Sequence, residues 1–334
     1  MRISLAAVTA FFSATAIAAP PATTCATCHA AQARTQPKTA MGIGIELPPD
    51  QSQLIAHPKL TYDRDGYRYT IERKDGVSLY TVSDGATSLT LPIRYAFGAH
   101  MQTFVFDYEG RFYESQVSYF PRIQGLGVTL GDEHRRPRTL VEAMGRETLN
   151  PEITACFECH ATNAVKQGKL TLDTLRPGLD CDHCHNGATA HMDALAQGKS
   201  APILQRLGAL AAEDMSTFCG KCHRTWEAIV QMRQFGVKNV RFQPYRIANS
   251  KCFLGDDKRI RCTACHNPHA NLAEGDTTYD AACQSCHAKQ FNPCPVAASK
   301  CATCHMPKIQ APGTEAIFTD HQIRIVRPGD PYPN

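Results

Sequence analysis

The octapeptide CTACHNPH occupies residues 262–269, and its first five residues follow a pattern, C-x-x-C-H, that occurs seven times in the chain. This pattern is the attachment sequence of c-type haem. Two thiols add to the haem vinyl groups, and the adjacent imidazole becomes the proximal ligand of the iron. Paired cysteines can also bind zinc, but zinc pairs do not need a histidine directly after the second cysteine. The motifs therefore predict seven covalently attached haems c.

Each motif supplies two attachment cysteines and one proximal iron ligand, and no catalytic residue stands out besides them. The predicted attachment residues are Cys25 and Cys28, Cys156 and Cys159, Cys181 and Cys184, Cys219 and Cys222, Cys262 and Cys265, Cys283 and Cys286, and Cys301 and Cys304. The predicted proximal ligands, in the same order, are His29, His160, His185, His223, His266, His287 and His305.

The spacing of the motifs divides the chain into two parts. After His29, 126 residues follow without a motif, and six motifs then fall within residues 156–305. A segment with so many haems cannot build an ordinary side-chain core, so we expect a haem core wrapped by short helices and loops. We predict a region with one haem over residues 19–150, a haem-rich domain with six over residues 151–327, and a flexible tail over residues 328–334.

The long interval between the first two motifs has the pattern of antiparallel β-structure. Residues 67–73 and 77–82 alternate on either side of a Lys-Asp-Gly turn, and residues 103–106 and 112–119 repeat this arrangement. Such alternation, with aromatic and β-branched residues, predicts hairpins. We expect a small antiparallel β-sheet over residues 57–120.

Helices are expected at two places in the haem-rich half. Ser200 followed by Pro202 suits a helix start, which predicts a helix over residues 202–212. Trp226, Ile229 and Val230 have helical spacing, with Gly236 as a stop.

The first residues have the pattern of a secretory signal peptide. Arg2 precedes an apolar run from Ile3 to Ile17, and residues 16–18 fit the small-x-small cleavage rule. We predict cleavage after Ala18 and a periplasmic or otherwise exported protein. No later stretch of about 18 apolar residues predicts a membrane span in the mature chain.

Two of the 16 cysteines lie outside the motifs, Cys252 and Cys294. In an oxidising compartment two such residues favour a disulfide, with two free thiols as the alternative. The formal charge of +4 also changes with the cofactor, because seven haems add about fourteen propionates and make the holoprotein acidic. The scattered basic residues suit propionate pairing, so nucleic-acid binding is not predicted.

Seven histidines remain outside the motifs, and the occupant of each second axial site separates an electron carrier from a catalyst. His191 and His269 each lie a few residues after a motif histidine, where the chain carries an imidazole towards a neighbouring haem. His321 follows Asp320, whose carboxylate could accept the second ring N–H. We predict His191, His269 and His321 as distal iron ligands.

The other candidates leave alternatives open. His57, His100 and His134 lie in the β-rich region, where a surface or polar core role is nearly as plausible as ligation. His183 lies inside an attachment loop and could serve only a second haem. Met41 is a further candidate, because a methionine ligand raises the haem potential. The count predicts mostly bis-histidine haems, with one or two sites ligated by methionine or open.

Several of these stretches carry a resemblance to a known family. The chain resembles the exported multihaem cytochromes c with doubled C-x-x-C-H motifs, related to the tetrahaem electron carrier of ammonia oxidisers. The resemblance implies electron transfer, the three distal histidines named above, and stacked and perpendicular haem pairs. Asn186 departs from the glycine that the family usually has there. The matching residues are 181–191, 250–253 with 262–269, and 301–308 with 320–321, and more loosely 39–42 and 98–119.

Two main functions fit these observations. The first is an electron carrier between redox partner proteins, favoured by the dense motifs and the supply of distal histidines. The second is an oxidoreductase of a small nitrogen or sulfur oxyanion, or of hydroxylamine, at one five-coordinate haem. No motif has Lys in place of His, so the lysine-ligated haem of pentahaem nitrite reductases has no counterpart. A module in which haem only holds the fold is a third class. We predict a carrier rather than an enzyme.

Overall fold

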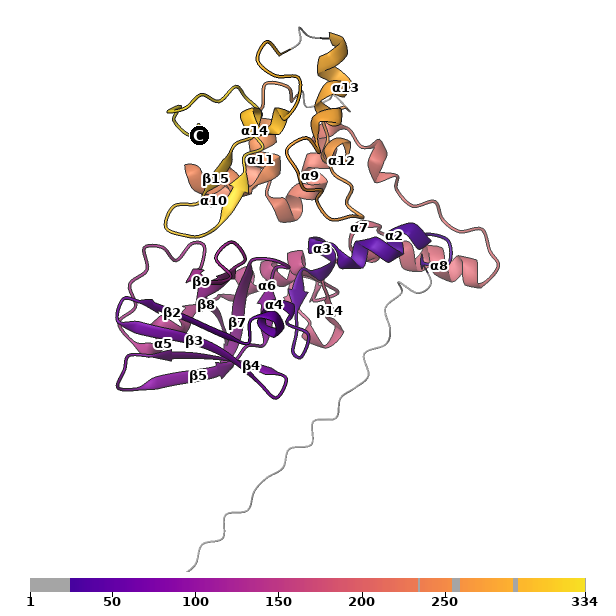
Figure 1. The fold of residues 1–334 in the computed structure, drawn as a ribbon. Helices are drawn as coiled ribbons and strands as arrows, with labels where there is room; N and C mark the ends of the chain where they lie inside the picture. Colours follow the sequence, from indigo (N-terminus) through magenta and orange to yellow (C-terminus); the bar gives the residue numbers. More distant parts are fainter. Residues whose placement is uncertain (1–24, 234, 254–258, 291–293, 334) are drawn as a thin grey trace, which may run out of the picture.

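The computed structural model describes residues 25–233, 235–253, 259–290 and 294–333, without the side chains of residues 288–290. The predicted signal peptide and its cleavage site lie outside these residues. The long β-strands gather in the N-terminal half of the chain, and the short helices of the C-terminal half lie against one side of them (Figure 1). No helix within the described ranges has the length and apolar character needed to cross a membrane.

The β-rich part contains two antiparallel sheets rather than the single small sheet that the sequence predicts. One sheet has four strands in the order β2-β3-β4-β5. The other has six strands in the order β1-β6-β7-β8-β10, with β9 paired to β8. The strands are β1 (Ile45–Glu46), β2 (Lys59–Arg64), β3 (Tyr67–Lys74), β4 (Val77–Ser83), β5 (Ser88–Pro92), β6 (Tyr95–Phe97), β7 (Gln102–Tyr108), β8 (Arg111–Phe120), β9 (Gly125–Val128) and β10 (Gly145–Glu147).

The predicted hairpins are confirmed. Asp75 and Gly76 join β3 to β4 with φ angles of 51° and 80°, and Glu109 and Gly110 join β7 to β8 with φ angles of 52° and 75°. Positive φ at both central positions is what a tight two-residue hairpin turn needs. Alternation identifies each strand, but it does not reveal which strands share a sheet, and this is why the second sheet was not predicted.

The two sheets enclose a hydrophobic core of their own. Tyr69 and Tyr80 point inward from the first sheet, and Phe104 and Phe106 point inward from the second, all with exposed fractions of 0%. The Tyr80 and Phe106 rings lie 4.6 Å apart, and the Tyr80 hydroxyl donates to the Met144 carbonyl at 3.1 Å. This part of the chain therefore has the ordinary side-chain core of a β-protein.

The second motif is attached to this β-structure by a separate apolar cluster. Helix α6 (Asn150–His160) places Phe157 edge-on against Tyr95 and Phe97 of β6, with ring centroids 4.9 and 5.1 Å away. The remaining shorter elements up to the third motif are α2 (Ala30–Thr35), η1 (Gln36–Lys38), α3 (Ala40–Ile43), α4 (Ser52–Ala56), α5 (Leu140–Met144), η2 (Leu172–Thr174), β11 (Ala161–Thr162) with β14 (Arg176–Pro177), and β12 (Val165–Lys166) with β13 (Lys169–Leu170).

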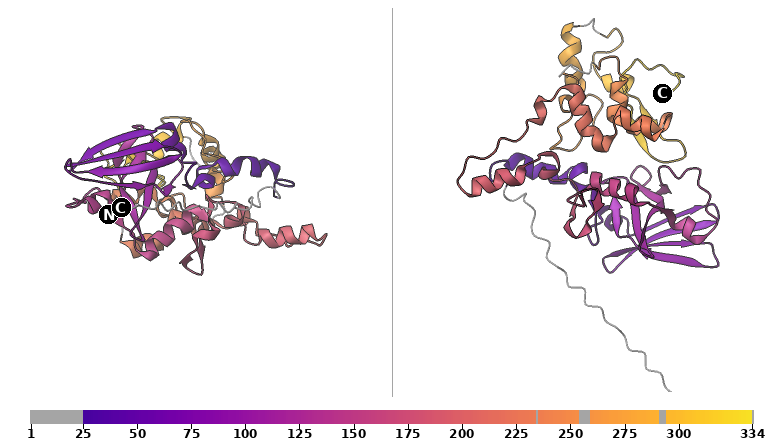
Figure 2. Two further views of the ribbon diagram at one scale, coloured as in Figure 1. Left: turned by 90° about the horizontal axis from the view of Figure 1, so that it is seen from below. Right: turned by 180° about the vertical axis from the view of Figure 1, so that it is seen from behind.

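The C-terminal half is built from short helices joined by long irregular segments (Figure 2). These are α7 (Cys181–Cys184), α8 (Ala188–Ala196), η3 (Leu207–Ala209), α9 (Ala212–His223), α10 (Trp226–Met232), η4 (Val237–Arg241), α11 (Gln243–Ala248), α12 (Cys262–Cys265), α13 (Asp280–Gln290) and α14 (Cys301–His305), with the hairpin β15 (Lys308–Gln310) and β16 (Ile317–Thr319). Among the described residues of this half, Ile229, Phe242 and Tyr245 form the largest buried apolar cluster of its own.

One helix was predicted correctly here and one was not. Helix α10 forms as expected and ends at Arg233, whose φ of 50° is left-handed, before the predicted stop at Gly236. The helix predicted over residues 202–212 is wrong, because residues 201–206 are irregular and Ile203 is 91% exposed. The helix in this region, α9, begins at Ala212 and leads directly into the fourth motif.

The C-terminal tail predicted to be flexible is also docked. The Tyr332 hydroxyl donates to Asn239 Oδ1 at 2.7 Å, and the Pro333 carbonyl accepts from Arg246 Nη1 at 3.0 Å. The Pro-rich composition misled the prediction, because it does not show that a buried arginine is available to bind the tail.

The β-core predicts a specific cost of truncation. We expect Phe106→Ala to lower the free energy of unfolding of the β-rich part by about 3–5 kcal/mol, because it removes a buried ring and leaves a cavity. Val77→Ala is the control, since Val77 is 37% exposed and its loss should cost little. Chemical denaturation followed by far-ultraviolet circular dichroism measures both. Equal costs for the two variants would show that the inter-sheet core does not carry this stability.

Candidate haem centres

The local geometry of the motifs suits attachment of one planar group from one side. In the first, third and fifth motifs the histidine N–H donates to the carbonyl of the first cysteine, at 2.8–2.9 Å. These three motifs thus each form one helical turn, and the second, fourth and sixth lie within longer helices. Residues at positions 1, 4 and 5 of a helical turn lie on one face, so both thiols and the imidazole face the same way.

Two imidazoles that are far apart in the sequence lie close together at the third motif. The His185 and His269 rings lie 6.1 Å apart, centroid to centroid, and their planes differ by 6°. An imidazole bound through Nε2 has its centroid about 3 Å from the metal, since imidazole–metal bonds are about 2.0–2.1 Å long. Two ligands on opposite sides of one iron are then roughly 6 Å apart. The pair has the spacing of two axial ligands of a single haem.

A second pair has the same spacing at the fifth motif. The His266 and His321 rings lie 6.1 Å apart with an interplanar angle of 42°. Burial lowers the pKa of His321 to about 4, which keeps the imidazole neutral and its lone pair available for a metal. The residues present therefore fit a haem between the rings of each pair.

The segment that carries His269 is held against the N-terminal helices. Asn271 Oδ1 accepts from the Ala40 N–H at 3.1 Å, and Asn271 Nδ2 donates to the Lys38 carbonyl at 3.2 Å. The side chain of Asn267 turns the loop by accepting from the His269 N–H at 3.0 Å. These contacts carry His269 away from its own motif and towards His185.

The segment that carries His321 is oriented differently from the sequence prediction. His321 Nδ1 donates to the Thr319 carbonyl at 3.0 Å, not to Asp320. The Asp320 carboxylate instead binds Arg246, at 2.8 Å from Nε to Oδ1. The predicted orienting role of Asp320 through the ring N–H is wrong, although a carbonyl at the same ring nitrogen fixes the tautomer equally well.

Other motif histidines have an oriented ring as well. His160 Nδ1 donates to the Gly44 carbonyl at 2.8 Å, and His305 Nδ1 donates to the Arg324 carbonyl at 2.9 Å. Burial lowers the pKa of His160. With Nδ1 committed to a carbonyl, Nε2 has the lone pair that a metal requires.

The remaining candidates for distal ligands fall into three groups. His191 Nδ1 donates to the Pro202 carbonyl at 2.9 Å, the orientation expected of a ligand, and the turn that leads to it is made by Gly187 at φ 87°. His57 Nε2 is hydrogen-bonded to the Tyr119 hydroxyl at 2.8 Å, which favours a structural role. His100 and His134 are exposed.

Among the described residues, neither the His183 ring nor the Met41 sulfur has a hydrogen bond or ring contact with the imidazole of a motif. Burial lowers the pKa of His183, and the charged side chains that act on it include Glu158 and Lys221 of the second and fourth attachment loops. The Met41 carbonyl accepts from the Leu179 N–H at 3.0 Å, so its segment packs directly behind the third motif.

Attachment cysteines of different motifs are close enough to change each other's pKa. Hydrogen bonding with Cys262 of the fifth motif, and then burial, raises the pKa of Cys219 of the fourth. Hydrogen bonding with Cys159 of the second motif, and then burial, raises the pKa of Cys222 of the fourth. The fourth motif therefore has the second and the fifth as direct neighbours.

Cysteines of the other motifs also raise the pKa of cysteines in a neighbouring motif. Burial and then the Cys25 thiol raise the pKa of Cys181 to about 11, which places the first motif beside the third. Burial raises the pKa of Cys265 of the fifth motif, and Cys286 of the sixth adds to the rise. Burial and Asp280 raise the pKa of Cys301 to about 11, and Cys283 of the sixth motif adds to the rise at this seventh site.

These neighbours define an order in space. The third motif joins the fourth through Cys184, which also acts on Cys219. The attachment sites thus follow one another as first, third, fourth, fifth, sixth and seventh, with the second beside the fourth. The element contacts agree, since α12 contacts α9, and α13 contacts α14.

The predicted disulfide between the two remaining cysteines is wrong, because Cys252 and Cys294 are both free in this structure. Cys252 lies among the attachment thiols, where it contributes to the raised pKa of Cys265 and of Cys283. Cys294 is exposed. The neighbours of Cys252 come from the fold of the haem-rich half, which cysteine counting does not reveal.

Two family descriptions match parts of the chain. One described as "Doubled CXXCH motif" matches residues 256–292, which include the fifth and sixth motifs. One described as "Cytochrome c554 and c-prime" matches residues 132–186, which include the second and third. No curated protein and no solved structure matches the chain. Within the described residues, no group of three or more His, Cys, Asp or Glu side chains could hold a metal ion by itself.

The ring pair at the third motif predicts the effect of one substitution. His269→Ala should leave every covalent attachment intact, because it alters no motif, and should convert one low-spin ferric haem to high spin by removing an axial imidazole. Electron paramagnetic resonance of the oxidised holoprotein and its intact mass measure the two quantities. His100→Ala is the matched control, because His100 is exposed. A low-spin complement unchanged in His269→Ala contradicts the assignment.

Proposed function

Because the chain is a multihaem cytochrome c of the family with doubled C-x-x-C-H motifs, and binds haem c covalently, we propose that it is a heptahaem electron carrier. It passes electrons between redox partner proteins in the periplasm or beyond, after removal of a signal peptide that ends near Ala18. The seven motifs supply the attachment cysteines and proximal histidines, and His191, His269 and His321 are the proposed distal ligands. Haem c supplies reversible one-electron chemistry.

The observation that carries this proposal is the proximity of cysteines of different motifs. Each thioether would be attached at the edge of its macrocycle, so neighbouring attachment cysteines would bring two macrocycle edges close together. Cys25 lies close enough to Cys181, Cys159 to Cys222, and Cys262 to Cys219 for the first thiol of each pair to raise the pKa of the second. Such an arrangement suits passage of electrons from centre to centre, and a lone catalytic haem would not require it.

The ring pairs support a carrier over an enzyme at two of the sites. His185 with His269 and His266 with His321 would occupy both axial positions of the iron between them. A site with both positions filled has no place for a small substrate to bind. The chain's own residues therefore favour electron transfer at the third and fifth motifs.

The distribution of apolar side chains supports a haem core for the C-terminal half. The β-rich part has a large cluster between its sheets, whereas the described residues of the other half form only a three-residue cluster of their own. Burial of apolar surface is the main driving force of folding. Porphyrins would supply the apolar surface that the side chains of this half do not.

The number of haems is tested by mass. We expect the intact mature protein to carry seven haems on a chain that begins at residue 19. A variant with Cys25 and Cys28 both changed to Ala should carry six, because each motif attaches one haem. Intact-mass spectrometry before and after the change measures both. A wild-type mass with fewer than seven haems would show that a motif is unused.

The function is tested by counting electrons and by looking for turnover. Coulometric titration should show seven one-electron reductions per chain, and reduced protein should be oxidised rapidly by an external electron acceptor such as a second cytochrome c. Mixing the reduced protein with nitrite, hydroxylamine or tetrathionate should give no product. Catalytic consumption of any of these substrates would overturn the carrier proposal in favour of the oxidoreductase.

A further inference from the structure

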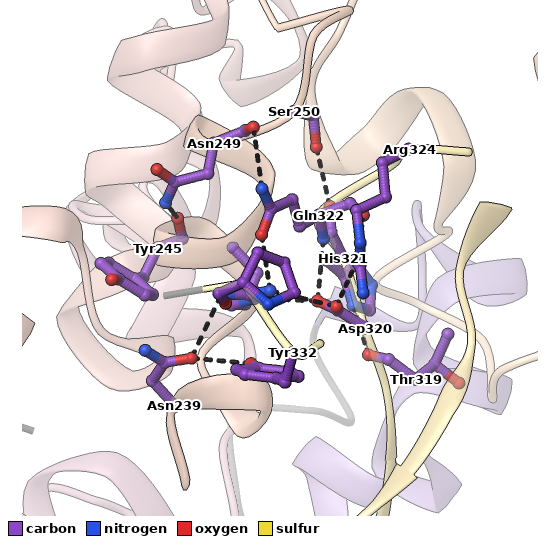
Figure 3. A network of polar contacts seen from close by, with 12 residues as sticks. Asn239, Tyr245, Asn249, Ser250, Thr319, Asp320, His321, Gln322, Arg324 and Tyr332 are labelled. Atoms are coloured by element: carbon purple, nitrogen blue, oxygen red, sulfur yellow. Dashed lines mark hydrogen bonds and ion pairs between the residues drawn. The ribbon is translucent and has the colours of Figure 1, made fainter. Parts of the chain in front are cut away.

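One charged network in the haem-rich half is completely buried. Arg246, on α11, and Asp320, directly before His321, both have exposed side-chain fractions of 0%. Arg246 Nε donates to Asp320 Oδ1 at 2.8 Å, and Arg246 Nη2 donates to Oδ2 at 3.1 Å. Arg324 Nη1 donates to the same Oδ2 at 2.6 Å. Figure 3 shows Asp320 within this network, with Gln322 and Arg324 of the C-terminal segment beside it.

Arg246 uses every donor that a guanidinium has. Besides the two bonds to Asp320, Nη2 donates to Gln322 Oε1 at 2.6 Å, and Nη1 donates to Asn239 Oδ1 at 3.3 Å and to the Pro333 carbonyl at 3.0 Å. The Tyr332 ring covers the guanidinium with its centroid 4.5 Å from Cζ. A buried charge is tolerated only when it is paired and hydrogen-bonded in this way.

The network fixes the backbone on both sides of His321. Asp320 Oδ1 accepts from the Gln322 N–H at 3.0 Å, and the Asp320 N–H donates to the Pro307 carbonyl at 2.9 Å. Ser250, two residues after α11, donates from Oγ to the His321 carbonyl at 2.9 Å and accepts from the Ile323 N–H at 2.8 Å. The peptide units before Asp320, after His321 and before Ile323 are therefore hydrogen-bonded, which leaves His321 little freedom of direction.

The same elements reach two further motif histidines. The Arg324 carbonyl accepts from His305 Nδ1 of the seventh motif at 2.9 Å. At the start of α11, Gln243 Oε1 lies 3.2 Å from His223 Nδ1 of the fourth motif. The buried pair thus joins segments that contact His321 and the histidines of the fourth and seventh motifs.

We propose that Arg246 and Asp320 are positioning residues that hold His321 on the iron of the fifth motif and support the orientation of His305 at the seventh. Neither side chain touches the iron in this arrangement. Their role is to set the path of residues 319–324, to which both imidazoles are hydrogen-bonded. The proposal rests on the proposed haem ligation, and its test separates the two.

The test uses the full-length holoprotein and compares Asp320→Asn with His321→Ala. Asp320→Asn places an amide N–H₂ group against the guanidinium donors of Arg246 and Arg324, and it removes the counter-charge of the buried Arg246. Residues 319–324 should then lose their fixed path, and His321 should leave the iron. We expect a high-spin ferric signal from one haem in both variants, by electron paramagnetic resonance. Added imidazole should bind that haem and restore low spin. The number of attached haems should stay unchanged by intact mass.

Two controls separate positioning from general stability. Glu133→Gln disturbs another ion pair, in which the carboxylate is nearly buried and its partner Lys238, at 2.9 Å, is 41% exposed; it should lower the melting temperature without a high-spin signal. Tyr332→Phe keeps the ring over Arg246 and removes only the bond to Asn239, so it should leave the spectrum unchanged. Arg246→Lys keeps the charge and should retain part of the low-spin signal that Arg246→Met loses.

The outcomes distinguish the two proposals. If His321→Ala itself remains fully low spin, the ligand assignment fails and the positioning role fails with it. If His321→Ala opens one haem but Asp320→Asn only lowers the melting temperature, as Glu133→Gln does, the positioning role alone is overturned. Should Asp320→Asn yield no holoprotein, Ser250→Ala makes the same test, because it frees the His321 carbonyl without unpairing a buried charge.

Discussion

A spacing of 6.1 Å between two imidazole rings is the constraint on which the proposed haem-rich half depends. In each of the two ring pairs, one histidine belongs to a motif and the other comes from a separate segment. A metal bond between such rings would close a long loop of chain, and closing the loop costs conformational entropy. The hydrogen bonds around Asn271 and Asp320 place the distal rings at the required distance, so that the iron does not have to organise the chain alone.

The two halves of the molecule differ in how many apolar side chains they bury. The β-rich part packs Tyr80, Phe104 and Phe106 between two sheets and has a complete side-chain core. The C-terminal half uses short helices of at most 12 residues, and its described residues bury few apolar side chains of their own. Phe157 joins the halves, because its helix packs on the β-structure and ends at His160.

The features that could be predicted from the sequence are those that depend on residues close together in the chain. One helical turn explains the motifs, and two-residue turns explain the hairpins, so both are visible in short windows. The sequence did not predict contacts between distant segments. Asn271 binds Ala40 across 231 positions, and Asp320 binds Arg246 across 74, which is why the role of Asp320 and the docking of the tail were misjudged. The helix expected over residues 202–212 failed because helical start signals do not supply a surface to pack against.

The central claim is that iron lies between His185 and His269 and between His266 and His321, in a chain that carries seven haems. Anomalous diffraction at the iron absorption edge, from crystals of the holoprotein, measures this directly. We expect seven iron peaks, one midway between the rings of each pair, in the order that the cysteine contacts define. Fewer than seven peaks, or an iron atom at the third or fifth motif without His269 or His321 on its far side, would contradict the account.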